Sequence, residues 1–197
     1  MSDFKVDIDL DAVEAASVRG HALDFPNTAI SNVIDAFVTG LAAVFNWVWL
    51  LLIVLIVTNV LLRYVIGTNF IAMEELQWHI YAVGFLLGLG YAVSLDGHVR
   101  VDVAAEHWPP RRRAWIEFFG LLCFVFPFIW IVVANAVPFV ERSFALNEVS
   151  AAPGGLPYRW VIKAFIIIAF AYLGLAALSR FLRVCAFLFG VPAPRPH

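Results

Sequence analysis

Residues 36–62, AFVTGLAAVFNWVWLLLIVLIVTNVLL, form a run of 27 residues without a charged side chain, bounded by Asp35 and Arg63. A lipid bilayer has a hydrocarbon core of about 30 Å, which roughly 20 apolar helical residues cross. As a helix with a rise of about 1.5 Å per residue, this run would be some 40 Å long. We therefore expect a transmembrane helix that tilts or extends beyond the hydrocarbon.

Three further apolar segments follow, at about residues 70–95, 114–140 and 158–181. In the whole chain 62% of the residues are hydrophobic and 14% are charged, whereas a soluble domain carries about 25% charged residues. The predicted fold is an all-α integral membrane protein with four transmembrane helices. Pro127, inside the third segment, predicts a kink.

Polar segments flank the predicted membrane domain, which we place at residues 28–187. Residues 1–27 form an acidic tail without a basic n-region or a cleavage site, so no signal peptide is expected. Residues 188–197 form a Pro-rich tail. After Pro26, apolar residues recur at helical spacing and predict an amphipathic lead-in helix, which either lies on the inner interface or continues the first span. The stretch DGHVRVDV, residues 96–103, predicts an interfacial loop segment between helices two and three.

The distribution of Lys and Arg predicts the orientation. With both termini inside, nine of these residues lie on the cytoplasmic side and four on the other side, so the positive-inside rule favours cytoplasmic termini. The formal net charge of −2 provides no basic field, which excludes nucleic-acid binding. We expect a multi-pass protein of the bacterial inner membrane.

The sequence offers few groups for catalysis. Ser143, Ser150 and Ser179 lack the GxSxG frame of a hydrolase, and no phosphate-binding GxxxxGK occurs, so an enzyme is not predicted. Cys123 and Cys185 stand alone in apolar runs, and we expect both to be core thiols. No span has an Asp, Glu, Lys or Arg at its centre, so the chain lacks the relay that a self-sufficient transporter needs.

Glu74, Glu75 and His79 form the densest group of ionisable residues, at the start of the second span. Glu75 and His79 lie one helical turn apart on one face. One histidine with carboxylates does not supply the ligand set of a structural zinc site. We therefore expect these side chains to be solvated by headgroups or paired with an arginine of a partner, and we predict no metal and no cofactor.

Gly84, Gly88 and Ala92 recur every four residues along the second span. Small residues at this spacing leave a smooth helix face on which another helix approaches closely. The alternative is the ordinary frequency of glycine in membrane helices. The first interpretation predicts that this face binds another membrane protein.

Three stretches carry a family resemblance: LLRYVIGTNFIAMEEL at 61–76, GLGYAVSLDGHVRVDV at 88–103 and EVSAAPGGLPYRWVIK at 148–163. They resemble, in order and spacing, the small membrane subunit of tripartite ATP-independent periplasmic (TRAP) transporters, the DctQ-like family. The second stretch is similar to that family's most characteristic motif. The resemblance covers about residues 63–183 and includes the four-span layout.

The resemblance implies a secondary uptake system. A periplasmic binding protein would deliver an organic acid to a large multi-span subunit that holds the sodium and substrate sites. The small subunit would act as a fixed scaffold that anchors the large subunit in the lipid bilayer. A chain with four spans, and with its charged residues confined to the membrane interfaces, agrees with such a role.

Three groups of residues are expected to meet these partners. The large subunit would be contacted near the outer face and on the glycine strip by Arg63, Glu74, Glu75, Gly84 and Gly88. The inner loop would be ordered and docked by His98, Arg100 and Asp102. The binding protein would be contacted on the outer loop at 148–157 by Glu148, Gly154 and Gly155.

Two other classes of protein remain open on the sequence. A haem-bearing membrane anchor of a respiratory enzyme would also be small, helical and dependent on partners. Haem b between helices needs facing histidines, whereas His79 is predicted at the outer end of its span and His98 just beyond the inner end. A Soret band in the purified protein would favour the anchor. Uptake by this chain alone would favour a self-sufficient small transporter.

Overall fold

The structure, a computed structural model, describes residues 25–94 and 108–191, and the secondary structure in these ranges is helical without strands. The first long helix comprises α2 (Ala29–Phe45), α3 (Trp47–Leu61) and the π-helical turn η1 (Leu62–Ile66). The second is α4 (Ile71–Ser94). The third comprises α6 (Pro110–Gly120), the π-helical turn η2 (Leu121–Val125) and α7 (Phe126–Ala145). The fourth is α8 (Trp160–Phe189).

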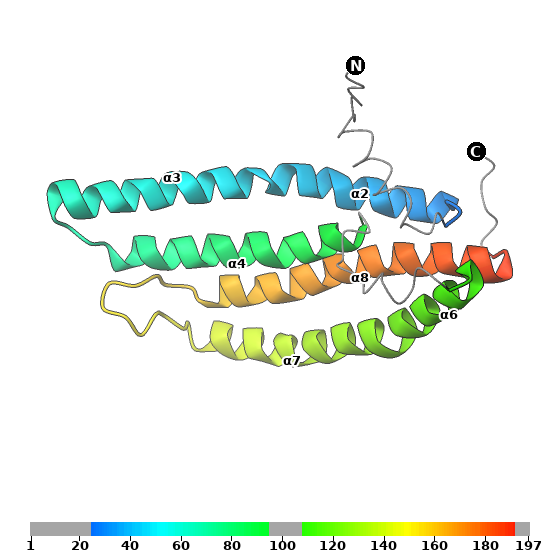
Figure 1. Cartoon of the computed structure of the whole chain (residues 1–197). Helices are drawn as coiled ribbons and strands as arrows, with labels where there is room; N and C mark the ends of the chain where they lie inside the picture. The colour runs from blue at the N-terminus through cyan, green and yellow to red at the C-terminus, as the bar shows by residue number, and fades with distance from the viewer. Residues whose placement is uncertain (1–24, 95–107, 192–197) are drawn as a thin grey trace, which may run out of the picture.

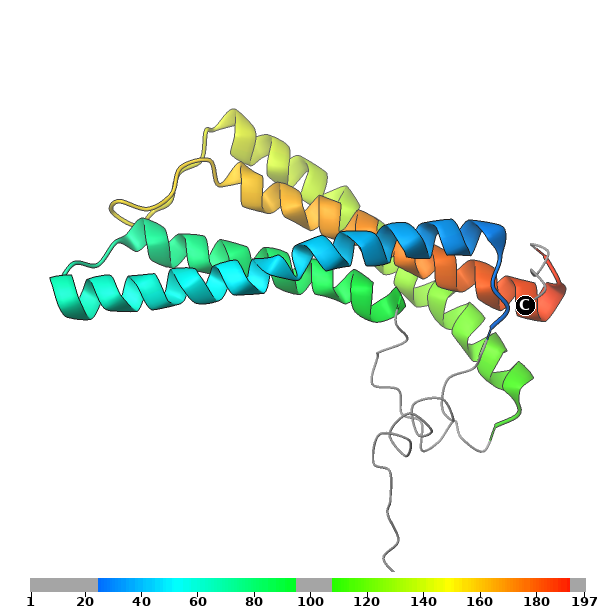
Figure 2. The same cartoon turned by 90° about the horizontal axis from the view of Figure 1, so that it is seen from above.

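These four long helices are each long and apolar enough to cross a membrane, as the sequence predicted. They lie side by side, with α8 in contact with α2, α4, α6 and α7 (Figure 1). Seen from above, the α7–α8 hairpin diverges from the α3–α4 pair toward the end that holds both hairpin loops (Figure 2). The described chain begins and ends at the opposite end of the bundle.

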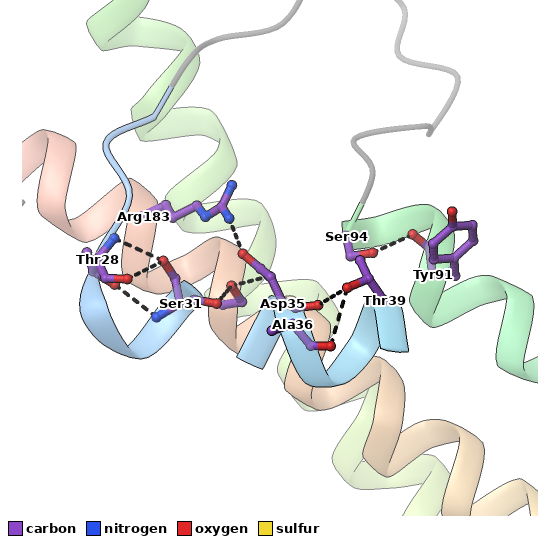
Figure 3. Close-up of polar contacts among 9 residues, drawn as sticks. Thr28, Ser31, Asp35, Ala36, Thr39, Tyr91, Ser94 and Arg183 are labelled. Carbon is purple, nitrogen blue, oxygen red and sulfur yellow. Dashed lines mark hydrogen bonds and ion pairs between the residues drawn. The ribbon is translucent and has the colours of Figure 1, made fainter. Parts of the chain in front are cut away.

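The lead-in helix continues the first span, which is one of the two predicted alternatives. The backbone N–H of Thr28 donates to Ser31 Oγ at 3.0 Å, and the N–H of Ser31 donates to Thr28 Oγ1 at 3.1 Å (Figure 3). This reciprocal capping box fixes the start of α2. Asn46, between α2 and α3, has helical dihedral angles, so the helix runs on without a break.

The predicted kink in the third span coincides with a π-helical turn. Pro127 has no N–H, and its ring clashes with the carbonyl four residues before it. The turn at Leu121–Val125 ends two residues before Pro127, and both prolines and π-helical turns are common causes of kinks in helices. Figure 1 shows the third helix curving between α7 and α6.

The expectation of two core thiols is wrong for Cys123, which is exposed, whereas Cys185 is half-buried. Cys123 lies in the third helix, which packs mainly against α8. Most of the circumference of that helix therefore faces outward. An apolar sequence around a cysteine does not decide which side of a membrane helix is covered.

The core lies where α2, α4 and α8 meet, and its buried side chains are Val38, Leu87, Ala169, Tyr172 and Ala176. The Tyr172 hydroxyl donates to the carbonyl oxygen of Val38 at 2.8 Å, which satisfies a polar group that would otherwise be buried without a partner. A Cβ atom on Gly90 would lie 2.3 Å from Tyr172 Cδ1. Glycine at this position therefore sets the close approach of α4 and α8.

We expect Gly90→Ala to lower the stability of the chain by about 1–3 kcal/mol, the usual cost of overpacking a core. Gly88→Ala is the matched control, since a Cβ there meets no atom within 4 Å, and alanine favours a helix over glycine by up to about 1 kcal/mol. Thermal unfolding of both variants in one detergent measures the difference. Equal stability of the two variants would contradict the Tyr172 contact.

Candidate functional site

Two ion pairs join α8 to other helices near the end where the described chain begins. Asp35 of α2 pairs with Arg183 (Figure 3) and also accepts a hydrogen bond from Ser179 Oγ at 2.6 Å. Glu117 of α6 pairs with Arg180. Both arginines therefore pair with carboxylates of neighbouring helices, and α8 continues past them to Phe189, beyond the predicted end of the span at residue 181.

Sequence reasoning counted Arg180 and Arg183 only as topology charges and missed these pairs. Two residues three apart share a helix face, and Asp35 and Glu117 begin spans at the same predicted side of the membrane. This signal suggests that each arginine meets a carboxylate. It does not assign the partners, because residue spacing within one helix does not say which helices are neighbours.

At the other end, Glu75 of α4 binds the loop that connects α7 to α8. Its Oε1 accepts a hydrogen bond from the Ser150 hydroxyl, and its Oε2 accepts one from the Leu156 N–H at 2.7 Å. The loop also closes on itself, since the Ser150 N–H donates to the Leu156 carbonyl at 3.1 Å. Glu75 thus holds residues 150–156 against the start of α4.

Gly155 lies where this loop meets Glu75. A Cβ atom there would lie 2.6 Å from Ser150 Oγ and 2.9 Å from Glu75 Oε2. Gly154, its neighbour, has a φ of 76°, a left-handed conformation that glycine adopts without strain. Both glycines are therefore required by the shape of the loop, and their contact with a binding protein stays a prediction.

Glu148, at the start of the same loop, pairs with Lys163 of α8. The hydrogen bond from the Lys163 ammonium is the main cause that lowers the pKa of Glu148 below its usual value. The carboxylate is therefore ionised at neutral pH. The backbone carbonyl of Glu148 also accepts from the Arg159 N–H at 3.0 Å, which joins the two ends of the loop.

One face of α4 carries residues at the 4-3-4-3 spacing of a helix–helix contact. We call this face the α4 seam, and it consists of Glu74, Trp78, Tyr81, Phe85 and Gly88. The three aromatic side chains are 72%, 48% and 53% exposed, respectively. The rings of Tyr81 and Phe85 stack with centroids 6.4 Å apart. The seam offers aromatic anchors and, at Gly88, a place for close backbone approach.

The glycines of α4 divide between contacts within the chain and open surface. Gly84 is buried, and a Cβ there would lie 3.2 Å from the Trp49 ring of α3. Gly88 is exposed, and Gly90, which the sequence analysis did not single out, packs on Tyr172. Only Gly88 of the two predicted glycines is open, and the role of both in a partner interface stays a prediction.

His79 and Arg63, two further residues that the sequence singled out, lie near the same end of the bundle as Glu75. His79 Nδ1 donates to the Glu75 carbonyl at 2.5 Å. Arg63 is exposed in η1, at the end of the first long helix. Across residues 25–94 and 108–191, no group of three His, Cys, Asp or Glu side chains is arranged to hold a metal ion. His98, Arg100 and Asp102 lie outside the described residues, as does the predicted interfacial segment.

Comparison with known proteins gives a consistent result. The sequence model for "Tripartite ATP-independent periplasmic transporters, DctQ component" matches residues 52–187. A sialic acid TRAP transporter permease protein, SiaT, of Haemophilus influenzae (strain 86-028NP) is 28% identical over 116 residues. This match covers 58% of the chain and 18% of the permease, so the chain spans less than a fifth of that relative. No solved structure matches the chain.

The family match covers the second half of the first long helix and continues nearly to the end of α8. It therefore includes the α4 seam, the Glu75-bound loop and both arginines of the ion pairs. The chain belongs to the DctQ family of components of tripartite ATP-independent periplasmic transporters.

Proposed function

We propose that this chain is the small scaffold subunit of a sodium-coupled, binding-protein-dependent transporter for organic acids. It would hold the large transport subunit in the inner membrane. The family supports a small subunit of a TRAP transporter in a multi-pass membrane arrangement. Sodium coupling rests on the family resemblance alone. The organic-acid class is also supported by the relative, whose name includes sialic acid.

The α4 seam is the observation that carries the scaffold role. Its three aromatic side chains are exposed, although the Tyr81 ring also packs edge-on against Trp49 of α3. Gly88 is open, while α2, α3 and α8 cover the buried side of α4. Membrane helices associate through close packing, because lipid tails are as apolar as leucine and give no hydrophobic drive. The α4 seam has the 4-3-4-3 spacing of a helix–helix contact and a glycine, so a helix of the large subunit can pack closely against it.

Charged residues near the outer end of the seam would fix the register of this contact. Glu74 belongs to the seam, and Arg63 is exposed at the adjacent end of the first long helix. We infer that both pair with groups of the large subunit. Glu75 contributes indirectly, because its carboxylate oxygens already bind Ser150 and Leu156. The inner-loop residues His98, Arg100 and Asp102 would contact the large subunit on the cytoplasmic side of the membrane.

The loop at 148–157 is the surface that we assign to the periplasmic binding protein. It is joined to α4 through Glu75 and to α8 through the Glu148–Lys163 pair. A loop that is held at two points presents a fixed shape, which lowers the entropy cost of binding. With both termini in the cytoplasm, as the positive-inside rule favours, this loop lies on the periplasmic side.

We expect Gly88→Leu to abolish co-purification with the large subunit. The new side chain meets no atom of this chain within 4 Å of its Cβ position, so the fold is retained while close approach at the seam is blocked. Gly120→Leu is the control, because that glycine of α6 is equally free of neighbours. Wild-type yield of the complex with Gly88→Leu would refute the seam as the interface.

We expect Glu75→Gln to loosen the outer loop, because the neutral amide offers one acceptor oxygen where the carboxylate offers two. Hydrogen exchange at the Leu156 amide should become faster, and uptake by the assembled transporter should fall. Glu141→Gln, at an exposed residue of α7, should leave both unchanged. Unaltered exchange at Leu156 in Glu75→Gln would show that this carboxylate does not hold the loop.

Reporter fusions test the proposed orientation. A reporter that is active only in the cytoplasm should work after His197, and one that is active only outside should work after Asn147. The physical reason is the excess of Lys and Arg on the cytoplasmic side. Reversed signals would place the outer loop in the cytoplasm and would exclude its contact with a periplasmic protein.

A further inference from the structure

An apolar groove lies between α3, α4 and the start of α8, where the two hairpins diverge (Figure 2). Its volume is about 490 Å³, within the range of about 300–1,000 Å³ that is usual for small-molecule sites. Leu51, Val83 and Val161 line it from the three helices. Among its described lining residues, only His79 and Tyr158 carry polar side-chain atoms.

A second, polar pocket of about 380 Å³ adjoins this groove and shares His79 and Ile162 with it. Its other lining residues are Glu75, Trp78 and Arg159. The Arg159 guanidinium forms no ion pair with any residue in the described ranges. His79 donates its Nδ1 proton to the Glu75 carbonyl, so Nε2 of the neutral imidazole is a hydrogen-bond acceptor. The two cavities together form a long apolar cleft, and the mouth of the cleft is lined by Arg159 and Glu75.

The walls of the groove belong to helices that span the membrane, so acyl chains surround its opening. An acyl chain fits such walls but gains little there, since lipid tails are as apolar as the side chains they replace. Selective binding of a lipid must therefore come from contacts between its headgroup and the polar pocket. A guanidinium there matches the oxygens of a phosphate in a bidentate way, and Trp78 has the amphipathic ring typical of the headgroup level.

We propose that the groove and the polar pocket bind one phospholipid. Its acyl chain lies between α3, α4 and α8, and its phosphate contacts Arg159. Glu75 lines the same pocket and carries a negative charge, so a further negative charge on the headgroup brings no gain. The site therefore recognises the phosphodiester that all phospholipids share. The bound lipid fills the space between the diverging hairpins, beside the loop that Glu75 holds.

Native mass spectrometry of the full-length chain in a mild detergent tests this proposal. The chain is offered dioleoyl phosphatidylethanolamine, dioleoyl phosphatidylglycerol, dioleoylglycerol or inorganic phosphate in separate samples. We expect one retained molecule of either phospholipid, and no retention of the phosphate-free diacylglycerol. Retention of diacylglycerol as strongly as phospholipid would overturn recognition of the phosphate. Binding of inorganic phosphate without retention of phospholipid would assign the pocket to a free anion.

Three variants separate the two parts of the site. Arg159→Gln removes the cation, and Val161→Trp fills the groove from a partly exposed position. We expect both to lose most of the bound phospholipid while their melting temperatures stay close to that of the wild type. Arg142→Gln, an exposed cation in the last turn of α7, is the control and should retain the lipid. Equal retention by all three variants would overturn the proposal.

The same measurement on the chain co-purified with a large membrane subunit distinguishes a lipid from a protein helix as the occupant. The proposal expects the phospholipid to stay bound in that complex. Its loss from the complex would show that a partner helix covers the groove, and would overturn the assignment. The Gly88→Leu test does not depend on this result, because Gly88 lines neither the groove nor the polar pocket.

Discussion

The close approach of α4 and α8 is the constraint on which the bundle depends. It occurs where Gly90 leaves room for the Tyr172 ring, and the Tyr172 hydroxyl extends the same contact to the backbone of α2. Because α8 also packs against α6 and α7, one helix connects all four spans. Its buried residues at the contacts are mostly small, and small residues let helix backbones approach in a medium that gives no hydrophobic drive for association.

Ionisable groups are held at the two ends of this bundle and serve different purposes there. At one end, the Asp35–Arg183 and Glu117–Arg180 pairs join α8 to α2 and α6. At the other end, Glu75 and the Glu148–Lys163 pair give the outer loop a fixed shape. The middles of the described spans contain no Asp, Glu, Lys or Arg. Such a distribution suits a subunit that supports transport by a partner.

Different parts of α4 have different roles. The side with Gly84, Leu87 and Gly90 is buried within the chain, while the seam from Glu74 to Gly88 is open. The proposed lipid groove lies on the same side of α4 as these buried residues but nearer the start of the helix, between α4 and the neighbouring helices α3 and α8. A single helix thus joins the core, the proposed partner interface and the proposed lipid site, because a helix that spans a bilayer presents different residues around its whole circumference.

The number and approximate bounds of the spans follow from the sequence alone, because the thickness of the bilayer dictates the length of an apolar helix. The site of the bend follows too, since Pro127 removes a hydrogen bond wherever the helix lies. The sequence also carries the motifs of the family. Tertiary structure alone decides that Gly90 packs on Tyr172, that Arg183 meets Asp35 and that Cys123 faces outward. These outcomes depend on which helices become neighbours, and the periodicity of one helix does not determine which other helix packs against it.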